Sequence, residues 1–156
     1  MLKTPYELAE RFIGTKEVSG HVDNPQVMAW LTADSTWPQN DEVPWCSGFV
    51  NWVCKIFRVT RSKSLRARSW LGVGTPVTLE CAKQGWDVCI FKRGGTNQPG
   101  PEVLDAPGHV AFFSAHNPSE EYNWVYVLGG NQRDEVSVSR YPVSQLLGIR
   151  RLRGLV

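Results

Sequence analysis

The chain has 156 residues, 42% of them hydrophobic, and a formal net charge of +2. This length fits one compact domain, residues 1–156, that buries a core of its own and leaves no room for a second domain. The charge is too small to indicate nucleic-acid binding, although it suits approach to an anionic polymer such as a cell wall.

Two short helices are predicted near the N-terminus. Residues 4–7, TPYE, hold an N-cap threonine, a proline at the first helical position and the glutamate of a capping box. Asn24 and Pro25 repeat the cap and the proline, and Val27, Trp30 and Leu31 then form an apolar stripe at helical spacing.

The central stretch, residues 41–57, reads DEVPWCSGFVNWVCKIF and places Cys46 at the opening of an apolar helix. Phe49, Val53 and Phe57 recur at helical spacing behind it. The first turn of a helix offers unpaired N–H groups and the positive end of its dipole, which together lower the pKa of a cysteine there. Cys46 is therefore a candidate nucleophile, and the alternative is an inert buried thiol.

The C-terminal half has the period of strands. From Trp86 onward, Val88 and Ile90 share one face while Cys89 and Phe91 share the other. Further strands are expected in GHVAFFSA, in NWVYVLGG, in DEVSVSRY and around residues 146–152, where the last strand closes the sheet. We therefore predict an α+β fold, with helices in the N-terminal half and an antiparallel sheet of about five strands in the C-terminal half.

Two segments between these elements carry further candidates. Residues 93–108 are rich in Gly and Pro and lead into GHVAFF, so they form either a wall or lid of a cleft or a plain connection between strands. Arg66 and Arg68, on a short helical segment at residues 64–71, meet an anionic substrate or lie on a solvated helix face.

A base and an orienting group follow Cys46 along the chain. His109 opens the strand after Gly108, and an imidazole there can pair with the thiolate and later protonate a leaving amine. Asn131, in LGGNQ, either accepts a hydrogen bond from the imidazole or serves a turn that needs positive φ. Gln132 is the neighbouring alternative if the register differs by one residue.

The segments PWCSGFVNW, GHVAFF and VLGGNQ, in this order, resemble papain-like cysteine peptidoglycan hydrolases of the CHAP and NlpC types, in particular small single-domain phage endolysins. The resemblance covers about residues 24–150 and implies a papain-like fold. It implies Cys46 as nucleophile, His109 as general base and acid, and Asn131 as the orienting group, although many relatives have a carboxylate or a second histidine in the third position.

The implied partner is bacterial peptidoglycan, cleaved as an N-acetylmuramoyl-L-alanine amidase or a stem-peptide endopeptidase. Trp45, Asp41 and Gln132 are the expected substrate contacts. Asp41 and Glu42 also look like the paired carboxylates of a glycosidase, but adjacent residues in an extended segment point apart. An antibacterial effector of a secretion system and a catalytically inactive wall-binding module are the alternative functions.

No signal peptide or membrane segment is recognisable, so we expect a monomer made in the host cytoplasm that acts on the wall after release. In that compartment Cys54, Cys81 and Cys89 are expected as thiols, with Cys54 in the core. The cysteine spacing differs from that of zinc sites and no calcium loop is present, so no cofactor or metal is expected.

Overall fold

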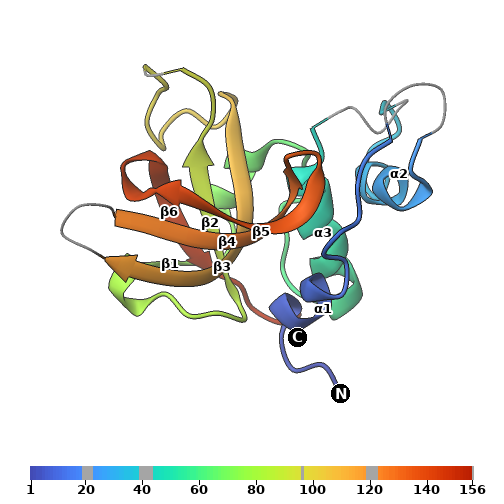
Figure 1. Cartoon of the computed structure of the whole chain (residues 1–156), viewed down its shortest axis with the longest axis horizontal. Coiled ribbons are helices and arrows are strands. Elements are labelled where there is room, and N and C mark those ends of the chain that lie inside the picture. Colours follow the sequence, from blue (N-terminus) through green and yellow to red (C-terminus); the bar gives the residue numbers. More distant parts are fainter. Residues whose placement is uncertain (19–22, 39–43, 96, 119–122, 156) are drawn as a thin grey trace.

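A computed structural model describes residues 1–18, 23–38, 44–95, 97–118 and 123–155 of the chain. Within these residues, three α-helices lie toward the N-terminus and six antiparallel strands form one sheet toward the C-terminus, so the fold is α+β as predicted. The helices gather at one side of the sheet, as Figure 1 shows.

The α-helices are α1 (Pro5–Glu10), α2 (Pro25–Leu31) and α3 (Cys46–Phe57). The two N-caps are confirmed, because Thr4 Oγ1 accepts from the N–H of Glu7 at 3.2 Å and Asn24 Oδ1 accepts from that of Gln26 at 2.9 Å. The capping box expected at Glu7 does not close on Thr4, since the Glu7 carboxylate accepts from the N–H of Lys3 at 2.6 Å. The helical segment expected at residues 64–71 is a 3-10 helix, η1 (Ala67–Gly72), and two single turns follow later, η2 (Leu79–Cys81) and η3 (Val143–Gln145).

The strands are β1 (Thr75–Val77), β2 (Asp87–Lys92), β3 (Gly108–Pro118), β4 (Asn123–Gln132), β5 (Glu135–Pro142) and β6 (Leu146–Arg151). Their order across the sheet is β1-β6-β2-β3-β4-β5. The last strand was predicted to close the sheet, but β6 lies between β1 and β2, so the two edges are β1 and β5. The three-residue β1 is the strand beyond the predicted five.

Both faces of the sheet are covered. Val88 and Ile90 belong to the core that the helices share with the sheet, whereas Cys89 and Phe91 belong to a second core on the opposite face. The alternation read in β2 is thus confirmed, and α3 packs across β3 and β4. This packing brings the start of α3 to the same end of the molecule as the start of β3.

Aromatic rings fix the start of α3 in the core. The ring of Trp45 lies 5.4 Å from that of Trp30, and Trp30 lies 4.8 Å from Phe49, measured between centroids. Gly130, near the end of β4, approaches Trp45 so closely that a Cβ atom there would lie 2.5 Å from the indole ring. Helix α3 and the end of β4 therefore hold one fixed relative position.

Candidate active site

Cys46 is the first residue of α3, and its side chain is buried with 2% of its surface exposed. The residue that precedes it, Trp45, makes no side-chain hydrogen bond to the helix start. An indole has no acceptor to offer, so the N–H groups of the first turn receive no cap from this residue. The sequence prediction for the position of Cys46 is confirmed.

His109, on β3, is near enough to Cys46 to act on the pKa of its thiol. Burial by itself raises the pKa of this thiol. The hydrogen bond and the charge of His109 oppose burial, the backbone N–H of Val110 and the charge of Arg93 add to them, and the net pKa of Cys46 is lowered. A thiol of lowered pKa in contact with an imidazole is the arrangement that nucleophilic catalysis by cysteine requires.

The group that holds the imidazole is Gln132, not Asn131. His109 Nε2 lies 2.9 Å from Gln132 Oε1, and Gln132 Nε2 donates to the carbonyl of Ser137 at 2.7 Å. The second bond fixes the direction of the amide, so its oxygen faces the ring. Nε2 of His109 then carries the proton, which leaves Nδ1 for the thiol.

A bulge in the β4–β5 pairing explains the one-residue difference. The register shifts between Gly129 and Gln132, and Asn131 has a left-handed φ of 57°. Bulges turn side chains to a different direction, and here the bulge points Gln132 at His109. The backbone of Asn131 is that of the turn residue that the sequence analysis weighed as its alternative role.

Tyr141, on β5, is a site residue that sequence reasoning missed. Its ring lies 5.1 Å from that of His109 and stacks on Phe91 at 4.8 Å, while its hydroxyl donates to Gln132 Oε1 at 3.5 Å. Burial, helped by the nearby charge of Cys46 and opposed by Arg93, raises the pKa of Tyr141 to about 12. The alternation of DEVSVSRY places Tyr141 on the face of Ser137 and was the available signal.

A cleft of about 360 Å³ opens beside Cys46. It is bounded by the start of α3, the start of η1, the end of β2 and the segment before β3, and its lining residues are Pro44, Cys46, Leu65, Arg66, Ala67, Arg93, Asp105, Ala106, Pro107 and Gly108. Part of segment 93–108 is thus a cleft wall, one of the two roles predicted for it.

Arg68 supports this wall from inside the protein. The side chain is fully buried, and its guanidinium donates to the carbonyls of Pro99, Gly100, Val103 and Pro107 at 2.7–3.1 Å. Neither role expected for Arg68 is correct, because a buried side chain lies on no solvated face and meets no substrate. Gly108 belongs to the same arrangement, since a Cβ there would lie 2.8 Å from Arg68 Cγ.

Two of the three expected substrate contacts, Trp45 and Gln132, lie within the described residues. Trp45 is fully buried and donates from Nε1 to Glu17 Oε2 at 2.8 Å, so it is a core residue with no surface for a substrate. Gln132 is 3% exposed and engaged with His109. Asp41, with Glu42, lies outside the described residues.

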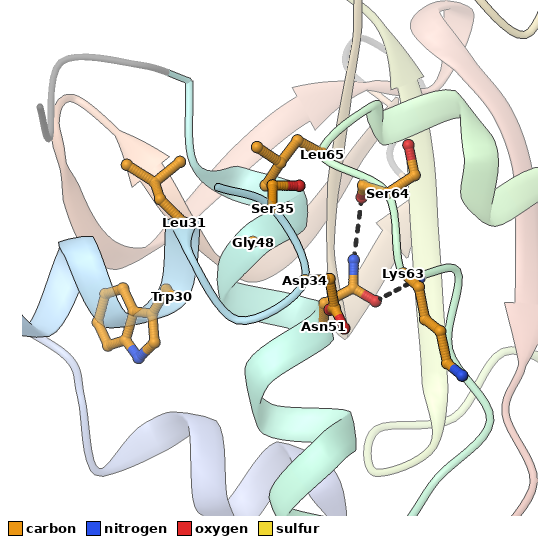
Figure 2. Close-up of a pocket in the computed structure, with 9 residues that line it drawn as sticks. All are labelled: Trp30, Leu31, Asp34, Ser35, Gly48, Asn51, Lys63, Ser64 and Leu65. Carbon is orange, nitrogen blue, oxygen red and sulfur yellow. Dashed lines mark hydrogen bonds between the residues drawn. The ribbon is translucent and has the colours of Figure 1, made fainter. Parts of the chain in front are cut away.

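A second hollow, drawn in Figure 2, lies between α2, α3 and the loop before η1. It has no room for a water molecule. Asn51 fills its edge with hydrogen bonds to the carbonyl of Ser64 and the N–H of Lys63. This region therefore packs the loop against α3 and offers no space for a ligand.

Within the described residues no group of three or more His, Cys, Asp or Glu side chains is arranged to hold a metal ion. The described helices include none that is long and apolar enough to cross a membrane. No protein-family model matches the chain, and no curated protein matches it significantly.

Proposed function

We propose that this protein is a cysteine hydrolase that cleaves an amide bond of bacterial peptidoglycan. The observation that carries the proposal is the thiol of Cys46, whose pKa is lowered by an imidazole that Gln132 holds from behind. The geometry supports amide or ester chemistry, and the resemblance to papain-like wall hydrolases supports peptidoglycan as the substrate.

The positions of these groups support the following reaction. Cys46 passes its thiol proton to Nδ1 of His109, the thiolate attacks the carbonyl carbon, and the N–H groups of Cys46 and Ser47 at the start of α3 stabilise the oxyanion. His109 then protonates the departing amine, which leaves an acyl group on sulfur. Water attacks this thioester with His109 as base, and the thiolate departs.

Gln132 and Tyr141 act through His109 in this scheme. Gln132 keeps the proton on Nε2 and so presents Nδ1 to the sulfur. The ring of Tyr141 covers the imidazole and restricts its rotation. The order nucleophile, base and amide orienter then matches that of papain-like enzymes, with glutamine in the third role.

The placement of Cys46 and His109 together, with the pKa of the thiol lowered, favours an enzyme over a wall-binding module that has lost catalysis, because binding alone needs no thiol paired with a base. Release of the protein from the cytoplasm to the wall, either as a phage endolysin or as a secreted effector, belongs to the same proposal. Neither route changes the chemistry at Cys46.

Digestion of purified peptidoglycan followed by mass spectrometry tests the function. We expect new amine and carboxylate termini at a single type of amide bond, and none with the Cys46→Ala variant. New reducing sugar ends would instead indicate a glycosidase. Intact peptidoglycan after prolonged incubation with the native protein would contradict the proposal.

A further inference from the structure

Two arginines from separate parts of the chain line the cleft beside Cys46. Arg66 directly precedes η1, and Arg93 directly follows β2, whose residue Phe91 pairs with His109. Both side chains are exposed, and neither makes an ion pair or a side-chain hydrogen bond with another described residue. Their charges are therefore available to a ligand.

The backbone at Arg66 is held in place by α3. Ser47 Oγ donates to the carbonyl of Ser64 at 2.5 Å, and Asn51 Nδ2 donates to the same carbonyl at 3.0 Å. The N–H of Arg66 in turn donates to Ser64 Oγ at 3.1 Å. Figure 2 shows Asn51 reaching across to this loop. The loop is thus fixed to the same helix that carries the nucleophile.

Arg93 is near enough to Cys46 for its charge to act on the thiol. Its positive charge contributes to the lowered pKa of Cys46 and opposes the raised pKa of Tyr141. Asp105, in the segment before β3, is the one acidic residue among the described residues that line the cleft, against two arginines. The described lining of the cleft therefore carries a net positive charge next to the sulfur of Cys46.

From this arrangement we infer that Arg66 and Arg93 bind a free carboxylate on the substrate residue adjacent to the scissile amide. A guanidinium presents a planar fork of donors that matches a carboxylate, and two of them around a cleft of this size orient one acidic group. The inference rests on the proposed function, since it names which stem peptides that activity accepts. Peptides whose neighbouring carboxylate is free are good substrates, and those with an amide in its place are poor ones.

The test compares two synthetic muropeptides that differ only in whether this carboxylate is free or amidated. The native protein is expected to cleave the free acid with a kcat/KM at least about tenfold higher, as a charge-assisted hydrogen bond implies. In the Arg66→Gln/Arg93→Gln double variant this ratio should fall to about one. The ratio is the readout because a general loss of reactivity, through the effect of Arg93 on Cys46, cancels in it.

Lys63→Gln is the matched control, because Lys63 is an exposed cation on the same loop that does not line the cleft. Its ratio should equal that of the native protein. Asp105→Asn removes the negative charge among the described residues that line the cleft. If the preference for the free acid vanishes in this variant, the assignment to the arginines is overturned. A ratio near one in the native protein would overturn it as well.

Failure of the inference is distinguishable from failure of the proposed function. If both muropeptides are cleaved at equal rates, the arginines bind no carboxylate but the amidase proposal stands. If neither is cleaved, calorimetric titration of both peptides into Cys46→Ala decides. If Cys46→Ala binds the free acid more tightly, and the triple variant Cys46→Ala/Arg66→Gln/Arg93→Gln loses this difference, the carboxylate site is supported. Equal binding of the two peptides by Cys46→Ala overturns it.

Discussion

Helix α3 carries two buried cysteines in different surroundings. Cys46 lies at its first residue, against His109 and the N–H of Val110, and its pKa is lowered. Cys54 lies two turns further along, fully buried among apolar side chains, and burial raises its pKa far above the ordinary value. The same helix thus holds one thiol whose pKa is lowered and one whose pKa is raised.

The comparison separates the effect of burial on the pKa of a thiol from the effect of its hydrogen-bonding and charged neighbours. Both thiols lose contact with water, which disfavours the thiolate in each case. At Cys46 an imidazole and a backbone donor outweigh that loss, whereas at Cys54 the distant charge of Arg61 does not. Position at the helix start matters because it exposes the sulfur to groups from β3.

The largest expected effect is a loss of activity on substitution of Cys46, which substitution of Cys54 should not cause. Cys46→Ala should lower amide cleavage by about a thousandfold or more, because covalent catalysis ends with the nucleophile. Cys54→Ala should retain kcat but lose about 1–2 kcal/mol of unfolding free energy through a small cavity. Kinetics on a soluble muropeptide and urea denaturation of both variants measure the two effects. An active Cys46→Ala protein would refute the assignment.

A smaller loss of kcat is expected from substitution of Gln132, which holds the imidazole of His109. Gln132→Ala should lower kcat by about ten- to a hundredfold, because His109 then loses the bond that fixes its tautomer and direction. Asn131→Gly is the matched control, since glycine accepts the left-handed backbone found there and should keep both kcat and melting temperature. The reverse result would return the orienting role to Asn131.

A further effect concerns pH and stability. Cys54 and Cys89 keep their protons in the folded protein well above the pKa of about 8.5 that a thiol has when unfolded. Because the unfolded chain loses these protons first, stability should fall as pH rises above about 8.5, by up to about 1.4 kcal/mol per pH unit and thiol.

Urea denaturation between pH 7 and pH 10 checks this slope. Cys54→Ala should remove one thiol from it, so the variant should lose less unfolding free energy over the same interval than the native protein does. Equal slopes for the two proteins would show that the buried thiol does not couple to unfolding.

Local sequence signals predicted most of the fold. The caps at Thr4 and Asn24, the helical spacing after Cys46 and the alternation in β2 each depend on neighbours within a few residues, and each is found in the structure. The place of β6 was not predictable in this way, since strand order depends on contacts between residues far apart. The short β1, TPV, has too few residues to show a period.

The candidate site shows the same division between residues that local sequence predicts and residues whose position depends on distant parts of the chain. Cys46 and His109 each stand at the start of an apolar element, a signal that is visible in the sequence. The bulge that selects Gln132 over Asn131 arises from pairing with β5, and the burial of Trp45 depends on packing against Gly130 and Trp30. The buried position of Arg68 likewise depends on four carbonyls that lie 31–39 residues away along the chain.

The close approach of Gly130 to Trp45 limits which substitutions positions 45 and 130 can accept during evolution. A side chain at position 130 would collide with the indole ring, and a smaller side chain at position 45 would leave a void beneath β4. Substitutions at these two positions are therefore expected to be accepted together, not one at a time. Among homologous chains, glycine at position 130 should accompany a large aromatic residue at position 45. This pairing would identify the chains that keep Cys46 and the glutamine of β4 in the same relative position.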